Sequence, residues 1–266
     1  MTVTPELTAK YNQLKARIAS LPSLAVAFSG GVDSTLLLKV VHDVLGHENT
    51  LAVFAETPLL PPGEGEAAKQ AINFVGSRLL TVGLNPLVWP EFIENPPERC
   101  YLCKKKIYQT FQEKLAELDF NILMDGTNLD DLSDFRPGLK ALHELNVRTP
   151  LADAGLTKNE VRQLSKSLDL PNWDKHSSSC LATRVATGQF IDEEKLEIIK
   201  QCENYLQSLN FRGCRVRLSA DSAIIELQEK DIEKLADGEK RRSVLKKFSN
   251  FNIKKLFLDL EGRKGI

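Results

Sequence analysis

The segment that most restricts the fold is a short apolar run that leads straight into a glycine-rich turn. Residues 24–28, LAVAF, stand between Pro22 and Gly30, a pattern typical of a buried β-strand. The next six residues, SGGVDS, precede a stretch that carries apolar residues at helical spacing and ends at Leu45. A strand that turns through two glycines directly into a helix begins a βα unit. We therefore expect an α/β fold.

The same alternation of strands and helices continues along the chain. Further strands are expected at residues 51–55, 79–82 and 121–124, and further helices at 64–77, 104–118 and 157–168. Thr157 and Glu160 have the spacing of a capping box at the start of the last of these helices. Strands that alternate with helices form a parallel sheet covered on both faces. We predict a doubly wound parallel sheet.

The pattern changes after residue 188. A helix is expected at 192–209, a hairpin at 215–227 around SADS, and a last strand at 253–258. We predict a main domain at residues 1–188 and a smaller α+β domain at 189–266. The polar stretch before the boundary, PNWDKHSSSCLATRVATG, is expected to be an ordered functional loop or a linker.

Composition narrows the range of partners. The chain has 266 residues and a formal net charge of −1, so it lacks the basic excess that usually marks a nucleic-acid-binding protein. No apolar run approaches the roughly 18 residues that a membrane helix needs, and the N-terminus does not have the pattern of a signal peptide. Five cysteines are an odd number in a chain this large. We therefore expect a cytoplasmic protein without structural disulfides and without a membrane partner.

The turn SGGVDS has the properties of a phosphate-binding loop. Two glycines let the backbone come close to a ligand, and the free N–H groups at the helix start attract an anion. The loop contains no lysine, so it is not the G-x-x-x-x-G-K-[ST] loop of kinases and GTPases.

SGGVDS resembles the pyrophosphate-binding loop of the ATP pyrophosphatase (PP-loop) superfamily, whose fold is adenine nucleotide alpha hydrolase-like. The resemblance implies cleavage of ATP to AMP and pyrophosphate. It assigns Ser29, Gly30, Gly31 and Ser34 to the pyrophosphate, and Asp33 to ATP binding, catalysis and Mg²⁺. A carboxylate beside phosphates is tolerable mainly when a hard cation bridges the two.

Further motifs resemble those of one family in this superfamily. They are GTNLDDLSDFRPG (126–138), PLADAGLTKNEVRQL (150–164), WDKHSSSCLATR (173–184), RVRLSADSAIIEL (215–227) and EGR (261–263). Over nearly the whole chain they resemble the LarE family, ATP-dependent sulfur transferases that make the nickel-pincer cofactor of lactate racemase. The resemblance implies that both carboxylates of pyridinium-3,5-biscarboxylic acid mononucleotide, a small nucleotide substrate, are adenylated and converted to thiocarboxylates. It also implies a homo-oligomer such as a hexamer.

Three cysteines lie in or near these motifs. Cys100 and Cys103 form the C-x-x-C of RCYLC, and Cys180 in SSSCLATR is their one obvious distant partner. Three thiolates without a fourth favour a 4Fe–4S cluster with an open iron that could carry sulfide. A zinc site with His176 as fourth ligand and a thiol redox pair remain alternatives. Some LarE relatives lack the C-x-x-C pair and give up the sulfur of one cysteine, so a sacrificial Cys180 is the rival mechanism.

The other two cysteines and the lysines after RCYLC receive structural roles. Cys202 and Cys214 lie outside the motifs and are expected to be small buried hydrophobes. Lys104–Lys106 are expected to form a solvated helix face.

Two arginines of the predicted hairpin are candidates for substrate binding. Arg215 and Arg217 alternate with apolar residues, so both guanidinium groups leave one face of the strand. The resemblance makes them anchors for the nucleotide phosphate, together with Glu226 and Arg263. The alternative is a pair of solvated arginines on an exposed sheet face.

Two other functions within the superfamily are alternative interpretations of the SGGVDS loop. A tRNA thiolase would use the same ATP chemistry but predicts a basic surface, which the net charge of −1 does not indicate. An amide-forming synthetase of the NAD or GMP synthetase type uses ammonia and needs no thiols. The three motif cysteines therefore favour a sulfur transferase.

Overall fold

A computed structural model describes residues 4–133 and 137–263 of the chain, which divides into two compact units. The larger unit comprises Met1–Thr57, Gly63–Leu84 and Glu98–Lys175, and the smaller unit comprises Pro58–Pro62, Asn85–Pro97 and His176–Ile266. The predicted motif at 126–138 includes residues 134–136, which lie outside the described residues. The longest segment of the smaller unit begins at His176. The domain limits 1–188 and 189–266 stay a prediction of which residues fold together.

Hydrogen bonds explain why residues 176–188 belong with the smaller unit. The Leu181 N–H donates to the carbonyl of Leu59 at 2.8 Å. The buried Asn95 side chain donates to the carbonyls of Ala186 and Gln189 at 2.8 and 2.9 Å. These bonds join the stretch to 58–62 and 85–97, and make it an ordered segment.

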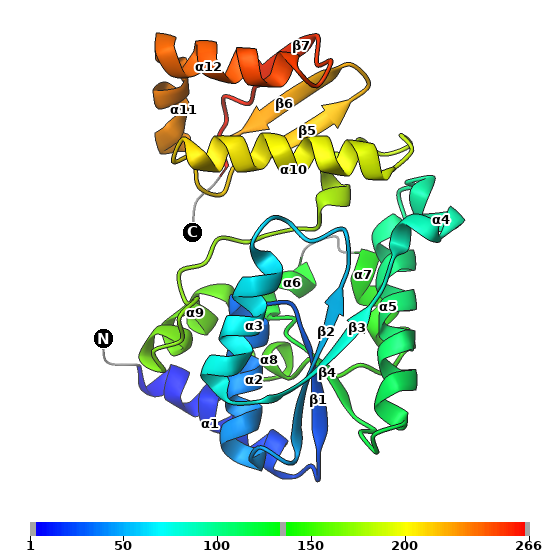
Figure 1. Ribbon diagram of the computed structural model, residues 1–266. Helices are drawn as coiled ribbons and strands as arrows, with labels where there is room; N and C mark the ends of the chain where they lie inside the picture. Colours follow the sequence, from blue (N-terminus) through cyan, green and yellow to red (C-terminus); the bar gives the residue numbers. More distant parts are fainter. Residues whose placement is uncertain (1–3, 134–136, 264–266) are drawn as a thin grey trace. The chain divides into compact units, whose positions relative to one another are not determined.

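The larger unit is built on a parallel sheet of four strands in the order β3–β2–β1–β4 (Figure 1). The strands are β1 (Leu24–Phe28), β2 (Thr50–Glu56), β3 (Arg78–Gly83) and β4 (Leu123–Asp125). Every residue of β1 is buried, as expected of a central strand covered on both faces. The prediction of a doubly wound parallel sheet is confirmed.

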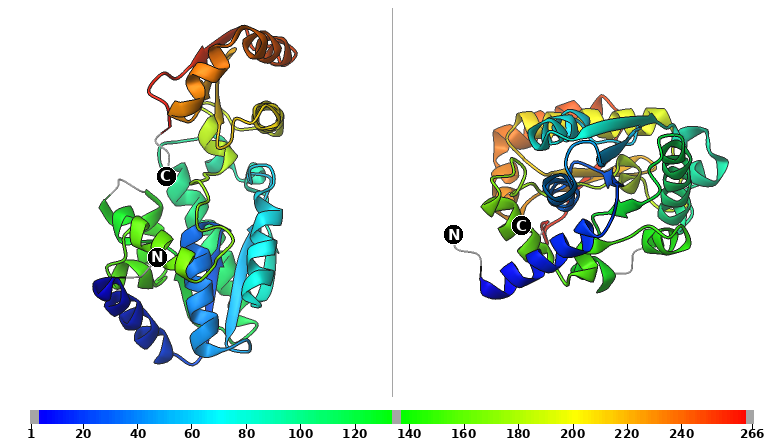
Figure 2. Two further views of the ribbon diagram at one scale, coloured as in Figure 1. Left: turned by 90° about the vertical axis from the view of Figure 1, so that its left-hand side faces the viewer. Right: turned by 90° about the horizontal axis from the view of Figure 1, so that it is seen from below.

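Helices cover both faces of this sheet. They are α1 (Pro5–Ala19), α2 (Val32–Leu45), α3 (Glu64–Val75), α5 (Arg99–Ala116), α6 (Leu129–Ser133), α7 (Pro137–Glu144), α8 (Pro150–Asp153) and α9 (Lys158–Ser167). Helices α1, α2, α3 and α9 lie on one side of the sheet, and α5 and α7 lie on the other (Figures 1 and 2). Within the described ranges, no helix has both the length and the apolar character that a membrane span requires.

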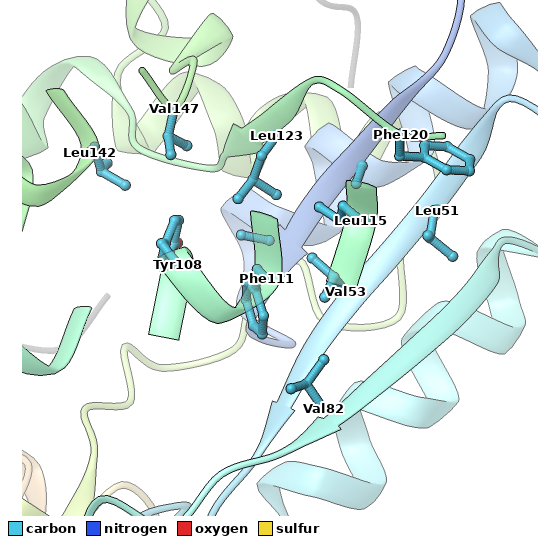
Figure 3. Close-up of a cluster of buried hydrophobic side chains, with 12 residues drawn as sticks. Leu51, Val53, Val82, Tyr108, Phe111, Leu115, Phe120, Leu123, Leu142 and Val147 are labelled. Carbon is cyan, nitrogen blue, oxygen red and sulfur yellow. The ribbon is translucent and has the colours of Figure 1, made fainter. Parts of the chain in front are cut away.

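The core between α5, α7 and the sheet holds α5 in place. Tyr108, Phe111 and Leu115, on one face of α5, are buried against Leu51, Val53 and Val82 of the strands (Figure 3). Apolar residues at this spacing form a single helical stripe, and its burial stabilises the helix. The position of the N-terminal turn of α5, which carries RCYLC, is therefore set by this packing.

Helix α5 begins earlier than the sequence pattern predicts. We expected residues 104–118, whereas the helix spans Arg99–Ala116, so both thiols of the C-x-x-C pair lie near its N-terminus. The expectation of a solvated face at Lys104–Lys106 is wrong for Lys104. Lys104 forms an ion pair with the buried Asp125 at 3.2 Å, and all three lysines are partly buried.

The start of α9 is fixed by the predicted capping box. Thr157 Oγ1 accepts from the Glu160 N–H at 3.3 Å, and Glu160 Oε2 accepts from the Thr157 N–H at 2.9 Å. Two of the donors that a helix start leaves without intrahelical partners are thereby satisfied. The box fixes the backbone at Lys158, the first helical residue.

The smaller unit contains a sheet of three strands in the order β5–β6–β7. Its elements are η1 (Pro86–Val88), α4 (Pro90–Ile93), η2 (Leu181–Arg184), α10 (Glu193–Ser208), β5 (Arg215–Ser219), β6 (Ser222–Glu226), α11 (Glu229–Ala236), α12 (Gly238–Ser249) and β7 (Lys255–Leu258). Strands β5 and β6 form the predicted hairpin, and β7 pairs with β6 in parallel. The prediction of a smaller α+β region is confirmed.

Candidate functional site

The loop between β1 and α2 lies at the carboxyl edge of the sheet and approaches α3 closely (Figure 1). Gly30 has φ +73°, and a Cβ atom there would lie 2.8 Å from the Cβ of Ala68. Both the backbone angle and the space therefore require glycine. Gly31 is the N-cap residue of α2 and has no side chain with which to cap the helix. The first N–H groups of α2 are therefore suited to bind an anion.

Two hydroxyl groups of the same loop lie close together. Ser29 Oγ and Ser34 Oγ are 3.2 Å apart, and Ser34 Oγ donates to the Gly31 carbonyl at 3.1 Å. The Gly31 N–H in turn donates to Ser29 Oγ at 3.3 Å. The predicted residues Ser29, Gly30, Gly31 and Ser34 thus form one small polar turn, and their binding of pyrophosphate stays a prediction.

Asp33 connects the loop with two distant segments. Its Oδ1 accepts from Asn128 Nδ2 at 3.1 Å, and its Oδ2 forms an ion pair with Lys158. Asn128 can approach because the neighbouring Gly126 has no side chain, and a Cβ atom there would lie 2.8 Å from the Ser34 nitrogen. Three parts of the chain therefore meet at one carboxylate.

The surroundings of Asp33 are compatible with magnesium only in the presence of phosphate. Magnesium is commonly held by one or two carboxylates together with substrate phosphates. Among the described residues, no three His, Cys, Asp or Glu side chains are grouped so that they could hold a metal ion by themselves. Asp33 fits the part of a single protein ligand beside a phosphate loop.

A second lysine and an asparagine contact the loop at Gly30. Lys175 Nζ donates to the Gly30 carbonyl at 3.0 Å and forms an ion pair with Glu64 at 2.8 Å. Asn172 Nδ2 donates to the Gly30 carbonyl at 3.2 Å and to Thr35 Oγ1 at 2.9 Å. The stretch 172–175 therefore holds the turn in its left-handed conformation.

Sequence reasoning assigned no role to several residues around the loop. They are Asn128, Lys158, Asn172 and Lys175. All of them except Asn172 lie within motifs that the sequence made visible, at 126–138, 150–164 and 173–184. The sequence therefore placed polar residues in these motifs, but it did not indicate which residue each of them contacts.

A buried carboxylate at the end of β4 ties α5 to the sheet. Asp125 accepts from the Tyr108 hydroxyl and from the Thr127 N–H, the latter at 2.8 Å, and pairs with Lys104. Burial by itself raises the pKa of Asp125, but the Lys104 ammonium and these hydrogen bonds outweigh it and hold the pKa below its usual value. The ionised carboxylate therefore anchors the N-terminal part of the helix that carries Cys100 and Cys103.

The two thiols of the larger unit lie on one face of α5. Cys100 is exposed and Cys103 is partly buried, and residues three apart on a helix have Cβ atoms about 5–6 Å apart. Cys180, also partly buried, precedes η2 in the smaller unit. The two thiols in α5 lie close enough together to bind one ligand. Binding of a cluster by all three thiols stays a prediction.

The segment around Cys180 is held by a buried arginine. Arg184 forms an ion pair with Glu203 of α10 at 2.9 Å, and both side chains are almost fully buried. The Arg184 Nη1 also donates to the carbonyls of Ser179 and Cys180 at 2.8 and 3.2 Å. Glu203 Oε1 accepts from the Val216 N–H at 3.0 Å as well. One carboxylate thus sets the Cys180 segment relative to β5.

The predicted arginines lie on the expected face of β5. Val216 and Leu218 are buried while Arg215 and Arg217 are partly exposed, in agreement with the predicted alternation. Arg217 forms an ion pair with Glu226, whose strand lies beside β5. The guanidinium groups of this set donate to the carbonyls of Ser177 and Thr183, which links the set to the Cys180 segment. The linked residues are the four predicted ones, Arg215, Arg217, Glu226 and Arg263.

Arg215 is an unusual cation in this group. Its Nε is buried and has no hydrogen-bond partner among the described residues. Burial and the charges of Arg263 and Arg184 lower the pKa of Arg215 to about 10. An anion bound here would relieve the repulsion and satisfy the buried donor. The group therefore suits a phosphate.

Known proteins resemble the chain over most of its length. An uncharacterized protein from Synechocystis, slr1717, is 39% identical over 256 residues, which cover 96% of this chain and 95% of that protein. Pyridinium-3,5-bisthiocarboxylic acid mononucleotide synthase from Lactiplantibacillus plantarum is 35% identical over 223 residues, covering 84% and 81%. A glutamine-hydrolyzing GMP synthase component from Methanocaldococcus jannaschii is 30% identical over 207 residues, covering 71% and 64%. No protein-family profile matches the chain.

The burial of the cysteines predicts their order of reaction with iodoacetamide. Burial raises the pKa of both Cys202 and Cys214 to about 12. A thiol ionises only when the pH approaches or exceeds its pKa, so both thiols stay protonated at pH 8. In reduced, cluster-free protein at this pH, Cys100, Cys103 and Cys180 should be modified first. Peptide mass spectrometry after short pulses measures the order.

The control for this order is the same pulse in denaturant, where all five cysteines should react at similar rates. Modification of Cys202 or Cys214 in the folded protein as fast as that of Cys100 would contradict the burial that the structure gives them.

Proposed function

Because the chain belongs to the family of pyridinium-3,5-bisthiocarboxylic acid mononucleotide synthase, the LarE family, we propose that it uses ATP and a sulfur donor to make thiocarboxylates on a pyridinium mononucleotide. The chain is an enzyme, and its family acts in sulfur transfer for the synthesis of this bisthiocarboxylate. The likeness to the L. plantarum synthase, over 84% of the chain, is the observation that carries the proposal. The arrangement of loop 29–34 supports its ATP chemistry.

The first half-reaction is activation of a carboxylate. A substrate carboxylate oxygen attacks the α-phosphorus of ATP, an O–P bond forms, and the bond to the β-phosphate oxygen breaks and releases pyrophosphate. The N–H groups at the start of α2 and the hydroxyls of Ser29 and Ser34 would bind the departing phosphates. Asp33 would hold Mg²⁺, which neutralises phosphate charge when bound.

The second half-reaction replaces AMP with sulfur. A sulfur nucleophile attacks the activated carbonyl carbon, the new C–S bond forms, and AMP leaves with the electrons of the C–O bond. In our proposal Cys100, Cys103 and Cys180 hold a 4Fe–4S cluster, which when bound offers an open iron for sulfide. In the rival mechanism the Cys180 Sγ attacks, and elimination across its Cα–Cβ bond then leaves dehydroalanine and the thiocarboxylate.

The arginines of the smaller unit would bind the nucleotide phosphate of the substrate. Arg215 and Arg217 share one face of β5, and Glu226 orients Arg217 through their ion pair. A planar guanidinium binds phosphate through two parallel hydrogen bonds. Arg263 would add a third cation, because its guanidinium donates to the Ser177 carbonyl, as that of Arg215 does.

No observation favours a tRNA thiolase or an amide-forming synthetase over this function. The chain spans 64% of the archaeal GMP synthase component but 81% of the bisthiocarboxylate synthase. We also propose that the protein acts in the cytoplasm as a homo-oligomer, such as a hexamer. Its product would be used by a nickel enzyme such as lactate racemase.

The test of the ATP chemistry is product analysis with an Asp33→Asn variant. Given the dicarboxylate mononucleotide, ATP, Mg²⁺ and a sulfur donor, the protein should release AMP and pyrophosphate in equal amounts. Asp33→Asn should slow this by at least about 100-fold, because it removes a charged metal ligand at the phosphates. Asp43→Asn, an exposed site on the same helix, should leave the rate unchanged. ADP and phosphate as products would refute the assignment.

The test of sulfur delivery uses single Cys→Ala variants in anaerobic protein. Replacement of Cys100, Cys103 or Cys180 should stop thiocarboxylate formation and lower bound iron, since each would remove one thiolate ligand. Cys202→Ala and Cys214→Ala are the buried controls and should retain both. Mass spectrometry of the chain after turnover separates the two mechanisms. A chain lighter by one hydrogen sulfide, with dehydroalanine at 180 and no iron, would defeat the cluster.

The phosphate role of the arginines predicts a change in KM. The double variant Arg215→Lys, Arg217→Lys keeps both charges but loses the bidentate geometry, so KM for the mononucleotide should rise at least about tenfold. KM for ATP should not change. Arg212→Lys, at an exposed position just before β5, is the matched control. An unchanged mononucleotide KM would mean that the two arginines are structural.

A further inference from the structure

The outer edge of β7 has no partner strand in the part of the chain that the structure describes. In the sheet order β5–β6–β7, this strand pairs with β6 alone. The N–H groups of Lys255 and Asp259 both donate toward β6. Because backbone groups alternate in direction along a strand, Leu256 and Leu258 present theirs to the outer edge. An open row of donors and acceptors of this kind is a template for a further strand.

The sheet also exposes an apolar pair beside this edge. Ile224 of β6 and Phe257 of β7 are partners in the parallel register, so their side chains leave the same face of the sheet. Ile224 is 38% exposed and Phe257 is 52% exposed, whereas Ala223 and Ile225 are buried on the other face. A large apolar side chain next to an open edge is a combination that favours contact with another chain.

The charges around Phe257 fit a second copy of the chain in one antiparallel register. Lys255 and Asp259 lie two residues to either side of Phe257, so all three share one face of the strand. When Phe257 lies opposite Phe257 of a second copy, each Lys255 faces the Asp259 of the other copy. Leu256 then lies opposite Leu258, and their outward backbone groups can exchange hydrogen bonds. The side chains and the backbone therefore select the same register.

Other registers fit less well. A shift by two residues places Phe257 opposite a charged residue, Lys255 or Asp259, and separates the opposite charges. A shift by one residue brings side chains of opposite faces together. A lysine at an edge commonly blocks pairing, and Lys254 already pairs with Asp221 at 3.3 Å. Lys255, in contrast, has no ion pair within residues 4–133 and 137–263, so its charge is available to a second copy.

Resting on the proposed homo-oligomer, we propose that two copies of the chain join at β7 in an antiparallel pair centred on Phe257. The sheets of the two smaller units then form one continuous sheet about a two-fold axis. The axis is perpendicular to the sheet, and the register Arg217–Ile224–Phe257 runs across one face. The phosphate-binding arginines of both copies therefore lie on the same surface of the assembly.

The experiment is sedimentation velocity of the full chain over a range of concentrations. Phe257→Lys should raise the Kd of the contact at least about 100-fold, because it replaces an apolar pair with two like charges directly opposite each other. At a given concentration the variant should form assemblies with half as many copies. Leu245→Lys changes another exposed apolar residue of the same unit, on α12, and should assemble like the wild type.

Charge reversal tests the register. Lys255→Asp places two carboxylates opposite each other, and Asp259→Lys places two ammonium groups opposite each other, so each single variant should weaken the contact. The double variant Lys255→Asp, Asp259→Lys restores opposite charges and should recover the assembly of the wild type. A double variant that is as dissociated as the single variants would overturn the proposed contact.

Two further outcomes would also overturn the inference. Phe257→Lys protein that assembles like the wild type would mean that the copies meet elsewhere. Wild-type protein that stays monomeric would mean that the edge of β7 meets another protein or none, and would also overturn the proposed homo-oligomer. The proposed ATP chemistry would stand in both cases, because it is measured separately as release of AMP and pyrophosphate.

Discussion

The geometry of the phosphate loop depends on the Asp33 carboxylate and its two partners. Asn128 follows β4 and Lys158 opens α9, so the bonds to Asp33 join three segments that are distant in sequence. The sheet order makes this possible, because β1 and β4 are neighbours and Ala27 pairs with Asp125. Their carboxyl ends therefore lead into loops that meet at one edge of the sheet, where ligands of open α/β sheets usually bind. Gly126 allows the final close approach.

In the smaller unit, Glu203 plays a comparable role. This buried carboxylate pairs with Arg184 and accepts from the Val216 N–H, so it fixes the segment of Cys180 and the strand of Arg215 and Arg217 in one arrangement. A buried ion pair contributes little net stability, because desolvation of both charges offsets their attraction. Its value here is geometric: it sets the residue assigned to sulfur transfer and the residues assigned to substrate phosphate in a fixed relation.

Local patterns were sufficient to predict the strands, the capping box of Thr157 and the hairpin of the smaller unit. They failed where the outcome depends on tertiary contacts. Helix α5 begins at Arg99 rather than Lys104, since its stripe of Tyr108, Phe111 and Leu115 packs on the sheet and Lys104 pairs with Asp125. The ion pair of Lys158 and Asp33 joins residues 125 positions apart, and periodicity carries no information about such a meeting.

The motif GTNLDD makes physical sense as a scaffold for the loop and not as a set of metal ligands. The Asp131 carboxylate accepts from the Asn128 N–H at 3.1 Å, and Asn128 Oδ1 accepts from the Asp130 N–H at 3.0 Å. The Asp130 carboxylate then accepts from the Lys158 N–H at 2.8 Å. Short polar side chains that bond to nearby backbone N–H groups stabilise tight turns. Each acidic residue thereby fixes the backbone of a residue that contacts Asp33, so the motif determines where the amide and the ammonium lie.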